Sequence, residues 1–418
     1  MSNLWRHRGP WPAVVAAVLA GIAVLAPAGA ATAAPKVRPG PLAAEIQPFL
    51  DTVTGSGVPG AYVQVRRDGR TFDGASGVAF VASGTPARAD FRHRIGSVTK
   101  SFVSTAVLQL VGERRLSLDT SVDRLLPRFE LDPRITVRQL LAHTSGIGNH
   151  TSALTYETVP EWQTRTFTPD ELVRLGQSFP ATGAPGERFS YSNTNYILAG
   201  LIIEKVTGND VAKEISRRIL EPLGLRDTYF PGSDPRIRGP HAGAYLPWPD
   251  PGTGEVTLRD FSVYNMTWIW TAGDMVSTMD DLNTFYRALF TGRLLRPVQQ
   301  RALLAGALPM IPEAPDAVRY GLGVYAMQLP CGTFYGHDGA VIGYVTQVLT
   351  SADGRTQVAA GVPYGLNFGA TPEQAAALNG LVHTAACGPQ AGASADQRRA
   401  SAASDLPLLP AAMRLGVN

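Results

Sequence analysis

The sequence predicts a mixed α/β (α+β) protein in which a single antiparallel sheet is built from both ends of the chain and a mostly helical lobe is inserted between the two halves. Two observations carry this prediction. Apolar and polar residues alternate, as they do in strands, at about 60–95 and again at 333–362. Between these stretches, apolar residues recur at helical spacing and are separated by long loops rich in Pro and Gly.

The expected elements follow in order along the chain. A helix over 41–54 precedes strand-like stretches at Gly60–Arg66, Thr71–Val78 and Phe91–Ile95, with a turn at Arg67-Asp68-Gly69. The strongest helix begins at Ser97, and further helical segments are expected at about 136–143, 168–177, 193–207, 209–220, 279–291 and 296–305. Strand character returns at Thr333–Gly336, Val341–Thr350 and Gln357–Val362, with a hairpin signal at Ser351–Gly354 and a last helix at 371–386. We therefore expect a discontinuous sheet domain of 34–96 and 318–387 around a helical lobe of 97–317.

The two ends of the chain differ in composition from its centre. Residues 1–33 have the pattern of a secretory signal peptide, because Arg6 and Arg8 precede the 13-residue apolar run Ala13–Leu25, and Ala31-Thr32-Ala33 offers an A-x-A cleavage site. A membrane anchor is the alternative, but the run is too short to cross about 30 Å of hydrocarbon. Residues 388–418 are rich in Ala, Ser, Gly and Pro and are expected to be a disordered or removed tail. These patterns predict a secreted, extracellular protein that leaves the membrane once its signal is removed.

The composition excludes several classes of function. With 37 Lys+Arg against 34 Asp+Glu in 418 residues, the net charge is +3, which argues against a nucleic-acid-binding protein. Charged residues make up 17% and apolar residues 44%, so the chain can build a sizeable core. Cys331 and Cys387 are the only cysteines, which excludes a Cys-rich zinc or iron–sulfur site. In an exported chain the two thiols can pair, and closing that loop would contribute about 4 kcal/mol on the chain-entropy model. Two buried free thiols are the alternative.

A first candidate for chemistry is Ser97-Val98-Thr99-Lys100, at the start of the strongest helix. Ser97 and Lys100 are three residues apart and share a helical face, and the helix N-terminus stabilises developing negative charge. A serine needs an adjacent base before it acts as a nucleophile. Lysine can be that base because burial lowers its pKa, whereas arginine stays protonated. The chain has four lysines against 33 arginines, so this spacing is unlikely to arise by chance. The alternative is a helix-capping serine followed by a solvated lysine.

Two further groups are weak in isolation. Tyr191-Ser192-Asn193 follows a Pro/Gly loop, and His337-Asp338-Gly339 lies between two of the expected strands. A tyrosine and an asparagine near a helix start are usually a packing aromatic and a cap, and a single histidine is usually structural. Together with Ser97 and Lys100, however, they supply a nucleophile, a base, a second proton carrier and a strand edge facing the nucleophile.

In this order and at these separations, the three groups resemble the motifs Ser-x-x-Lys, Tyr-x-Asn and Lys/His-Thr-Gly of the penicillin-recognising serine hydrolases. The chain resembles most closely the secreted D-alanyl-D-alanine carboxypeptidases related to class C β-lactamases. The resemblance runs over about 41–387 and includes Ile135–Gly146, Tyr191–Tyr196, Ala272–Asp281, Tyr320–Gly323 and Tyr335–Tyr344. It implies a β-lactamase/transpeptidase-like fold, and the carboxypeptidase branch places a cysteine pair where Cys331 and Cys387 stand.

The resemblance also implies roles for the catalytic residues. Ser97 would attack the carbonyl and become acylated, and Lys100 would take its proton. Tyr191 would relay the proton to the leaving amine and later help to activate water. Asn193 would hold Lys100 and the amide oxygen of the substrate. The backbone N–H groups of Ser97 and Ala340 would form the oxyanion hole, a contribution of about 3 kcal/mol for each donor.

Other positions are implied on the substrate side of the site. His337 stands where β-lactamases carry lysine and would supply hydrogen-bond donors and positive potential near Tyr191. Gly339 completes the third triplet. Trp268 would line the cleft wall, although packing in the core is an equal alternative. His143 corresponds to a structural position in the family.

The chain departs from the carboxypeptidase pattern where those enzymes bind the free carboxylate of the substrate. Two hydroxyls and an arginine are replaced by Asp338, Ala340 and Tyr325. A carboxylate facing the substrate carboxylate is repulsive, and a charge-assisted donor is missing. We therefore expect acyl transfer to be retained, but with a neutral or cationic leaving group.

The main expectation is thus a serine-type D-alanyl-D-alanine carboxypeptidase acting through a Ser97 acyl-enzyme on D-amino-acid or cell-wall peptides, with β-lactams as acylating inhibitors. The alternative is a D-stereospecific peptidase, amidase or esterase of the same superfamily, and a second alternative is a penicillin-binding sensor that is acylated without turnover. No cofactor, metal or nucleic acid is expected, and a monomer is expected. The α/β-hydrolases fit poorly because the sequence contains no Gly-x-Ser-x-Gly motif.

Overall fold

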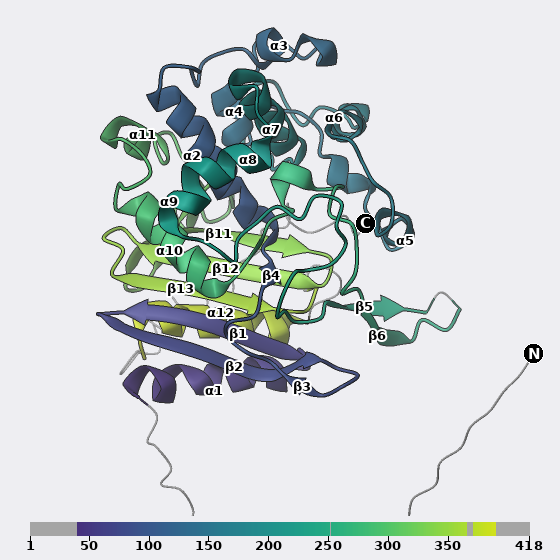
Figure 1. Ribbon diagram of the computed structural model, residues 1–418, viewed down its shortest axis with the longest axis vertical. Coiled ribbons are helices and arrows are strands. Elements are labelled where there is room, and N and C mark those ends of the chain that lie inside the picture. The colour runs from purple at the N-terminus through teal and green to yellow at the C-terminus, as the bar shows by residue number, and fades with distance from the viewer. Residues whose placement is uncertain (1–39, 251, 366–370, 390–418) are drawn as a thin grey trace, which may run out of the picture. The chain divides into compact units, whose positions relative to one another are not determined.

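A computed structural model (Figure 1) describes residues 40–250, 252–365 and 371–389. The expected signal peptide and nearly all of the expected tail lie outside these ranges. The described chain forms a nine-stranded antiparallel sheet in the order β3-β2-β1-β13-β12-β11-β10-β9-β8, which confirms the predicted fold class. The strands are β1 (Gly60–Arg67), β2 (Arg70–Phe80), β3 (Thr85–Pro86), β8 (Leu308–Pro309), β9 (Val318–Tyr320), β10 (Tyr325–Leu329), β11 (Gly332–Val341), β12 (Tyr344–Ser351) and β13 (Thr356–Val362).

The two ends of the chain meet in the middle of this sheet, where β1 pairs with β13 and Tyr62 lies opposite Gly361. Helices α1 (Pro41–Gly55) and α12 (Pro372–Cys387) cover one face, and α10 (Met279–Phe290) covers the other (Figure 1). Alternation along β1 supplies both cores, because Val63 and Val65 pack toward α1 and α12 while Tyr62 packs toward the helical lobe.

The helical lobe is built around α2 (Thr99–Gly112) and α7 (Thr194–Thr207), most of whose residues are buried. Shorter helices surround them: α3 (Val122–Leu125), α4 (Val137–Leu141), α5 (Val159–Trp162), α6 (Pro169–Ser178), α8 (Val211–Ile215), α9 (Glu221–Leu223) and α11 (Pro297–Ala302). Capping boxes at Thr136 and Thr168 define where α4 and α6 begin, and Thr371 does the same for α12.

Three local predictions need correction. The expected strand at 91–95 is only β4 (His93–Arg94), and it pairs with β7 (Val276–Ser277) outside the main sheet. The strands β9 and β10 were not expected. Most importantly, His337-Asp338-Gly339 lies inside β11 rather than between two strands. Asp and Gly usually mark turns, but here the strand is continuous, and its turn falls after Val341.

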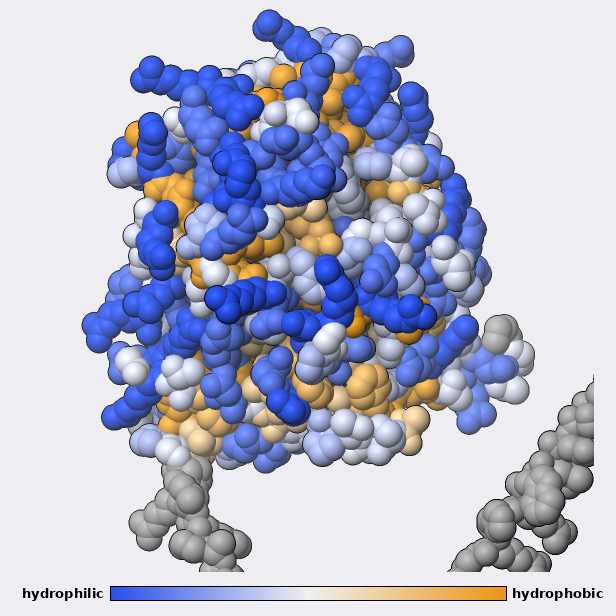
Figure 2. Space-filling model, in the orientation of Figure 1, coloured by the Kyte–Doolittle hydropathy of each residue, from blue (hydrophilic) through white to orange (hydrophobic). Residues whose placement is uncertain are grey.

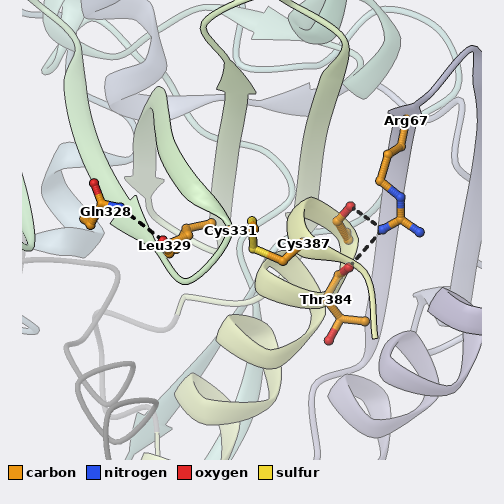
Figure 3. Close-up of a disulfide and its surroundings, with 7 residues drawn as sticks. Arg67, Gln328, Leu329, Cys331, Thr384 and Cys387 are labelled. Atoms are coloured by element: carbon orange, nitrogen blue, oxygen red, sulfur yellow. Dashed lines mark hydrogen bonds between the residues drawn. A yellow bond between two sulfur atoms is a disulfide. The ribbon is translucent and has the colours of Figure 1, made fainter. Parts of the chain in front are cut away.

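Cys331 and Cys387 form a disulfide in the structure, with their Cα atoms 5.5 Å apart. The bond joins the β10–β11 turn to the last residue of α12 (Figure 3). Beside it, Arg67 on β1 donates to the carbonyl oxygens of Thr384 and Ala385, at 3.2 and 3.1 Å. The Thr384 carbonyl also accepts from the backbone N–H of Gly388 at 2.8 Å, and the guanidinium adds a side-chain donor at this end of the helix, where the last carbonyls run out of intrahelical partners. The C-terminal end of α12 is therefore fastened to both halves of the sheet.

Few large apolar side chains are exposed in the described part of the chain. Figure 2 shows a largely hydrophilic face, with apolar residues visible mainly in recesses between polar ones. In the described ranges the exposed large hydrophobic residues are Val81, Val256, Leu258, Val263 and Val298. Two of these lie on β6 (Val256–Asp260), which forms a hairpin with β5 (Tyr245–Pro249). Among the described helices, none combines the length and the apolar character needed to span a bilayer.

Candidate active site

Ser97 lies in a short 3-10 turn, Gly96–Val98, that leads directly into α2. Gly96 has a φ of 53°, and a Cβ atom added to it would lie 2.6 Å from the backbone nitrogen of Ala340 on β11. A Cβ atom on Gly339 would lie 1.9 Å from the carbonyl oxygen of Ile95. Glycine is therefore required on both sides of this contact, which brings β11 beside the serine at the start of α2.

Lys100 is fully buried one helical turn after Ser97. Its Nζ lies 2.9 Å from the Ser97 Oγ, 2.7 Å from the Asn193 Oδ1 and 2.7 Å from the carbonyl oxygen of Ala272. Burial lowers the pKa of Lys100 well below its usual value, because a buried ammonium loses its hydration. The sequence-predicted pair thus meets in space, together with Asn193 from the second motif.

These three contacts determine where the lone pair of a neutral Lys100 points. The Asn193 Oδ1 and the Ala272 oxygen are carbonyl oxygens that can only accept, so each takes one N–H of the amine. The remaining position, the lone pair, faces the Ser97 hydroxyl, which can donate its proton along this contact. This is the arrangement of a general base beside a nucleophile.

Tyr191 packs on the same group, with the Lys100 Nζ 4.8 Å from the centre of its ring. The ring of His143 also packs against Tyr191, with the two ring centres 4.1 Å apart. The Tyr191 hydroxyl makes no hydrogen bond of ordinary geometry among the described residues. Burial raises the pKa of Tyr191 well above its usual value, and the nearby Ser97 hydroxyl opposes this rise. Tyr191 is therefore a neutral phenol that can donate a proton.

Asn193 is positioned by a local network at the start of α7. Its Nδ2 donates to the Thr151 Oγ1 at 2.9 Å, and its backbone N–H donates to the Asn149 Oδ1 at 3.0 Å. These bonds orient the amide so that its oxygen faces Lys100. Asn149 and Thr151 were not predicted from the sequence, because their position depends on a loop that folds back over the second motif.

His337 is buried on β11 and both of its ring nitrogens are engaged. Nδ1 donates to the carbonyl oxygen of Asp338 at 2.5 Å, and Nε2 accepts from the Tyr320 hydroxyl at 2.9 Å. Burial, reinforced by Lys100, lowers the pKa of His337 to about 3. The prediction that His337 supplies positive potential and free hydrogen-bond donors is therefore wrong. The ring is neutral at physiological pH, and both of its nitrogens are hydrogen-bonded within the protein.

Asp338 on β11 and Tyr325 on the neighbouring strand β10 form a second buried pair. The Tyr325 hydroxyl donates to the Asp338 Oδ1 at 2.5 Å, and both side chains are almost fully enclosed. Burial raises the pKa of Asp338 to about 8. The prediction that Asp338 repels a substrate carboxylate therefore needs correction. Near pH 7 the Asp338 carboxyl is mostly protonated, so the repulsion acts only at higher pH. Tyr325 supplies no cation in the place of the missing arginine.

Comparison with known proteins identifies the family. A family model described as Beta-lactamase matches residues 42–369. The chain belongs to the β-lactamase family. A D-stereospecific amidohydrolase from Streptomyces sp. superposes with a TM-score of 0.74 and 34% identity, covering 82% of this chain and 98% of that one. A D-amino acid amidase from Ochrobactrum anthropi SV3, complexed with D-phenylalanine, gives a TM-score of 0.69 and 27% identity over 78% and 92% of the two chains.

Among curated relatives, esterase EstB of Burkholderia gladioli is 35% identical over 189 residues, which is 42% of this chain and 48% of the esterase. The match therefore spans about half the length of that relative. The relatives are an amidohydrolase, an amidase and an esterase, so membership of the β-lactamase family leaves the substrate class open.

Of the two alternatives for Trp268, lining the cleft wall or packing in the core, the structure shows the second. Its side chain is 1% exposed, and its ring packs 5.9 Å from that of Trp162. Trp270, two residues later, is partly exposed and has a φ of 33°. Sequence reasoning missed the Ala272 carbonyl as well, although Ala272–Asp281 belongs to the matched family stretch, because a backbone contact leaves no signature in side-chain type.

Within the described ranges, no cluster of His, Cys, Asp and Glu side chains could hold a metal ion. One surface cavity of about 350 Å³ lies at the C-terminal end of α2, lined by residues such as Gln109, Arg217 and Gln299. None of the three family motifs contributes to its lining, so it is separate from the Ser97 site.

The charge state of Asp338 leads to a prediction about stability. Because its pKa is raised in the folded state, folding favours the protonated form, and stability falls as the pH rises from about 4 to about 8. Asp338→Asn cannot ionise and keeps an oxygen for Tyr325. We expect the melting temperature of Asp338→Asn to exceed that of the wild type at pH 9 by more than at pH 5. Thermal unfolding at both pH values measures this, and equal differences would contradict the assigned charge state.

Proposed function

We propose that the protein is a serine acyl hydrolase that cleaves amide bonds of D-amino-acid derivatives, with Ser97 as the nucleophile and Lys100 as the general base. The observation that carries the proposal is the fully buried Lys100, whose two carbonyl acceptors leave its lone pair directed at the Ser97 hydroxyl. The amidohydrolase and amidase relatives support the substrate class.

Acylation begins when Ser97 attacks the amide carbonyl and gives its proton to Lys100. The backbone N–H groups of Ser97 and Ala340 stabilise the oxyanion, a role that fits the close approach of β11 to the Gly96 turn. The tetrahedral intermediate collapses as Tyr191 donates its proton to the leaving nitrogen. The Lys100 ammonium then returns a proton to Tyr191, so the amine leaves neutral and the acyl group stays on Ser97.

Deacylation reverses these proton transfers with water in place of the amine. Tyr191 and Lys100 remove a proton from water as it attacks the ester, and the proton returns to Ser97 when the acid departs. The buried positions of Tyr191 and Lys100 support this role, because each group is held in its neutral form between the two half-reactions.

The leaving group is proposed to be neutral rather than a free D-alanine carboxylate. Where a carboxypeptidase would bind a carboxylate with hydroxyls and an arginine, Tyr325 and Asp338 bond to each other, and Ala340 offers a methyl group. This supports the amidase alternative over the carboxypeptidase expected by default. An ester substrate is a second candidate, favoured by the identity with esterase EstB. We also propose that the protein is exported, on the signal-peptide pattern of 1–33.

A matched pair of substrates tests the proposal. Each contains the same D-amino-acid peptide, once with a C-terminal carboxylate and once with a C-terminal amide, and kcat/KM is measured at pH 7 and pH 9. We expect the amide to be preferred at both values, by a larger factor at pH 9, where Asp338 is ionised. The L-enantiomers serve as controls for stereospecificity. A clear preference for the acid would contradict the proposed leaving group.

The nucleophile is tested separately with a fluorophosphonate probe. Wild-type protein should be labelled, and Ser97→Ala should not. A fluorescent penicillin distinguishes the sensor alternative, because a sensor would stay labelled and hydrolyse none of the amide or ester substrates. Labelling of Ser97→Ala equal to that of the wild type would refute the assignment of Ser97.

A further inference from the structure

His143 is a buried residue that the mechanism above does not use. It lies just after α4, its side chain is fully buried, and its φ of 55° is in the left-handed region. Such a φ is uncommon for any residue other than glycine, and it persists only where surrounding contacts hold the backbone. In His143 both the carbonyl oxygen and the ring contact the segment that carries Tyr191.

Tyr191 lies in a segment that is neither helix nor strand, so its backbone lies outside the helix and sheet ladders. The backbone N–H of Ser190 donates to the His143 carbonyl oxygen at 2.8 Å, and the backbone N–H of Ser192 donates to the His143 Nδ1 at 3.1 Å. One residue therefore bonds the chain on both sides of Tyr191. The same ring packs against the ring of Tyr191, with 33° between the two planes.

The donors around His143 determine which of its nitrogens carries the proton. Besides the Ser192 N–H, the Asn195 Nδ2 lies 3.3 Å from Nδ1, and the Asn195 Oδ1 already accepts from the Ser145 hydroxyl at 2.6 Å. Two N–H donors meet at Nδ1, which is therefore the unprotonated nitrogen that accepts. Burial, reinforced by Lys100 and His337, lowers the pKa of His143 well below its usual value. The ring is thus a neutral acceptor at physiological pH.

The Tyr191 hydroxyl depends on these contacts for its position. It makes no hydrogen bond of ordinary geometry among the described residues. Its place is therefore set by the backbone of 190–192 and by the packed rings, those of His143 and of Tyr320, whose centre lies 6.3 Å from that of Tyr191. A general acid must stay within hydrogen-bond reach of the atom that it protonates, and a displacement of about 1 Å can cost about 10²-fold in rate.

We propose that His143 is a positioning residue for proton donation by Tyr191: it bonds the backbone on both sides of Tyr191 and packs on its ring, which holds the phenol hydroxyl within reach of the leaving nitrogen. The inference rests on the proposed roles of Ser97 and Tyr191. In the step concerned, the bond between the carbonyl carbon and the nitrogen breaks as the nitrogen takes the Tyr191 proton, and the Lys100 ammonium returns a proton to Tyr191. His143 itself exchanges no proton.

Two substrates with the same acyl group test the inference on the full-length protein. They are the amide and the p-nitrophenyl ester of the D-amino acid that the wild type cleaves fastest. The amide needs a proton on its leaving nitrogen, whereas the ester releases a stable phenolate without one. Because kcat/KM ends at acylation, the ratio of kcat/KM for the amide to that for the ester reports the proton donation. A change in folding or in binding of the acyl group moves both values together.

Three variants at His143 separate its contacts. His143→Phe keeps a ring but removes the acceptor for the Ser192 N–H, and His143→Gly fits the φ of 55° but removes both contacts. Each should lower the amide-to-ester ratio at least tenfold, so the glycine variant serves if the phenylalanine variant does not fold. His143→Asn brings its Oδ1 to about the position of Nδ1 and tolerates a left-handed φ, so its ratio should stay within threefold of the wild type.

His383→Phe is the matched control. His383 is half-buried on α12, which covers the face of the sheet opposite to the helical lobe. This variant should keep the ratio, and both kcat/KM values, within twofold of the wild type.

Tyr191→Phe, which lacks the hydroxyl, sets the full loss of the ratio. Adding His143→Phe to it should lower kcat/KM for the amide by less than a further threefold, because the group that His143 positions is already absent. A further tenfold loss overturns the inference, as does an unchanged ratio in folded His143→Gly, or a ratio in His143→Asn as low as in His143→Gly. An unchanged ratio in Tyr191→Phe, or hydrolysis by Ser97→Ala, overturns the proposed function instead.

Discussion

Replacing Lys100 by arginine is expected to lower kcat/KM for amide hydrolysis by about 10³-fold or more. Arginine stays positively charged and cannot accept the Ser97 proton, whereas burial lowers the pKa of Lys100. General-base catalysis typically contributes 10²–10⁴-fold to the rate. The larger guanidinium must also fit a fully buried site in which the Nζ already contacts Ser97, Asn193 and Ala272. Steady-state kinetics and labelling by the fluorophosphonate probe should both report the loss.

Two other lysines provide the control for this substitution. Lys205 and Lys213 are exposed on the surface of the helical lobe, and arginine is a conservative exchange at such positions. Lys205→Arg and Lys213→Arg should retain wild-type kinetics and melting temperature. If Lys100→Arg retained more than a tenth of the wild-type kcat/KM, Lys100 would not be the base.

Replacing Gly339 by alanine should reduce kcat/KM by about 10²-fold or more. The added Cβ atom would lie 1.9 Å from the Ile95 carbonyl oxygen and 3.1 Å from the Ser97 nitrogen, so the strand and the nucleophile turn must separate. That movement displaces the two proposed oxyanion donors, each of which typically contributes about 3 kcal/mol to the transition state. Activity and thermal unfolding should both be measured, because the strain also lowers stability.

Gly380→Ala is the matched control, because a Cβ atom on this α12 glycine meets only ordinary contacts with Phe49. Alanine favours helices by about 1 kcal/mol over glycine, so this variant should be fully active and at least as stable as the wild type. Full activity in a folded Gly339→Ala protein would show that the close approach of β11 does not matter for catalysis.

Much of this architecture could be predicted from the sequence. Periodicity located α2, α7, α10 and α12, because long amphipathic or buried helices leave a strong signal. The pairing of Ser97 with Lys100 followed from helical spacing and from the scarcity of lysine. The contacts of Lys100 with Asn193 and Tyr191 are those expected from the resemblance of Tyr191-Ser192-Asn193 to the second family motif.

The failures have a common physical cause, which is burial that a local sequence pattern does not reveal. His337 and Asp338 looked like charged groups in a turn, but a central strand encloses them and makes both largely neutral near pH 7. For Trp268 the sequence left lining of the cleft wall and packing in the core as equal alternatives, and the side chain lies in the core. The contacts of Ala272 and Asn149 depend on loops folding back from distant parts of the chain, which neither propensity nor spacing encodes.

The order of strands in the sheet has a consequence for how the protein acquires activity. Tyr62 on β1 pairs with Gly361 on β13. The inner edge of the β1–β2 hairpin is therefore covered only after almost the whole chain has been synthesised. Such distant pairings slow folding and leave a strand edge open during synthesis. Ser97 and Lys100 lie within a single turn of helix and can approach each other early, whereas Ala340, the proposed oxyanion donor on β11, arrives only with the last strands. Catalytic competence is therefore expected to be a late event in folding.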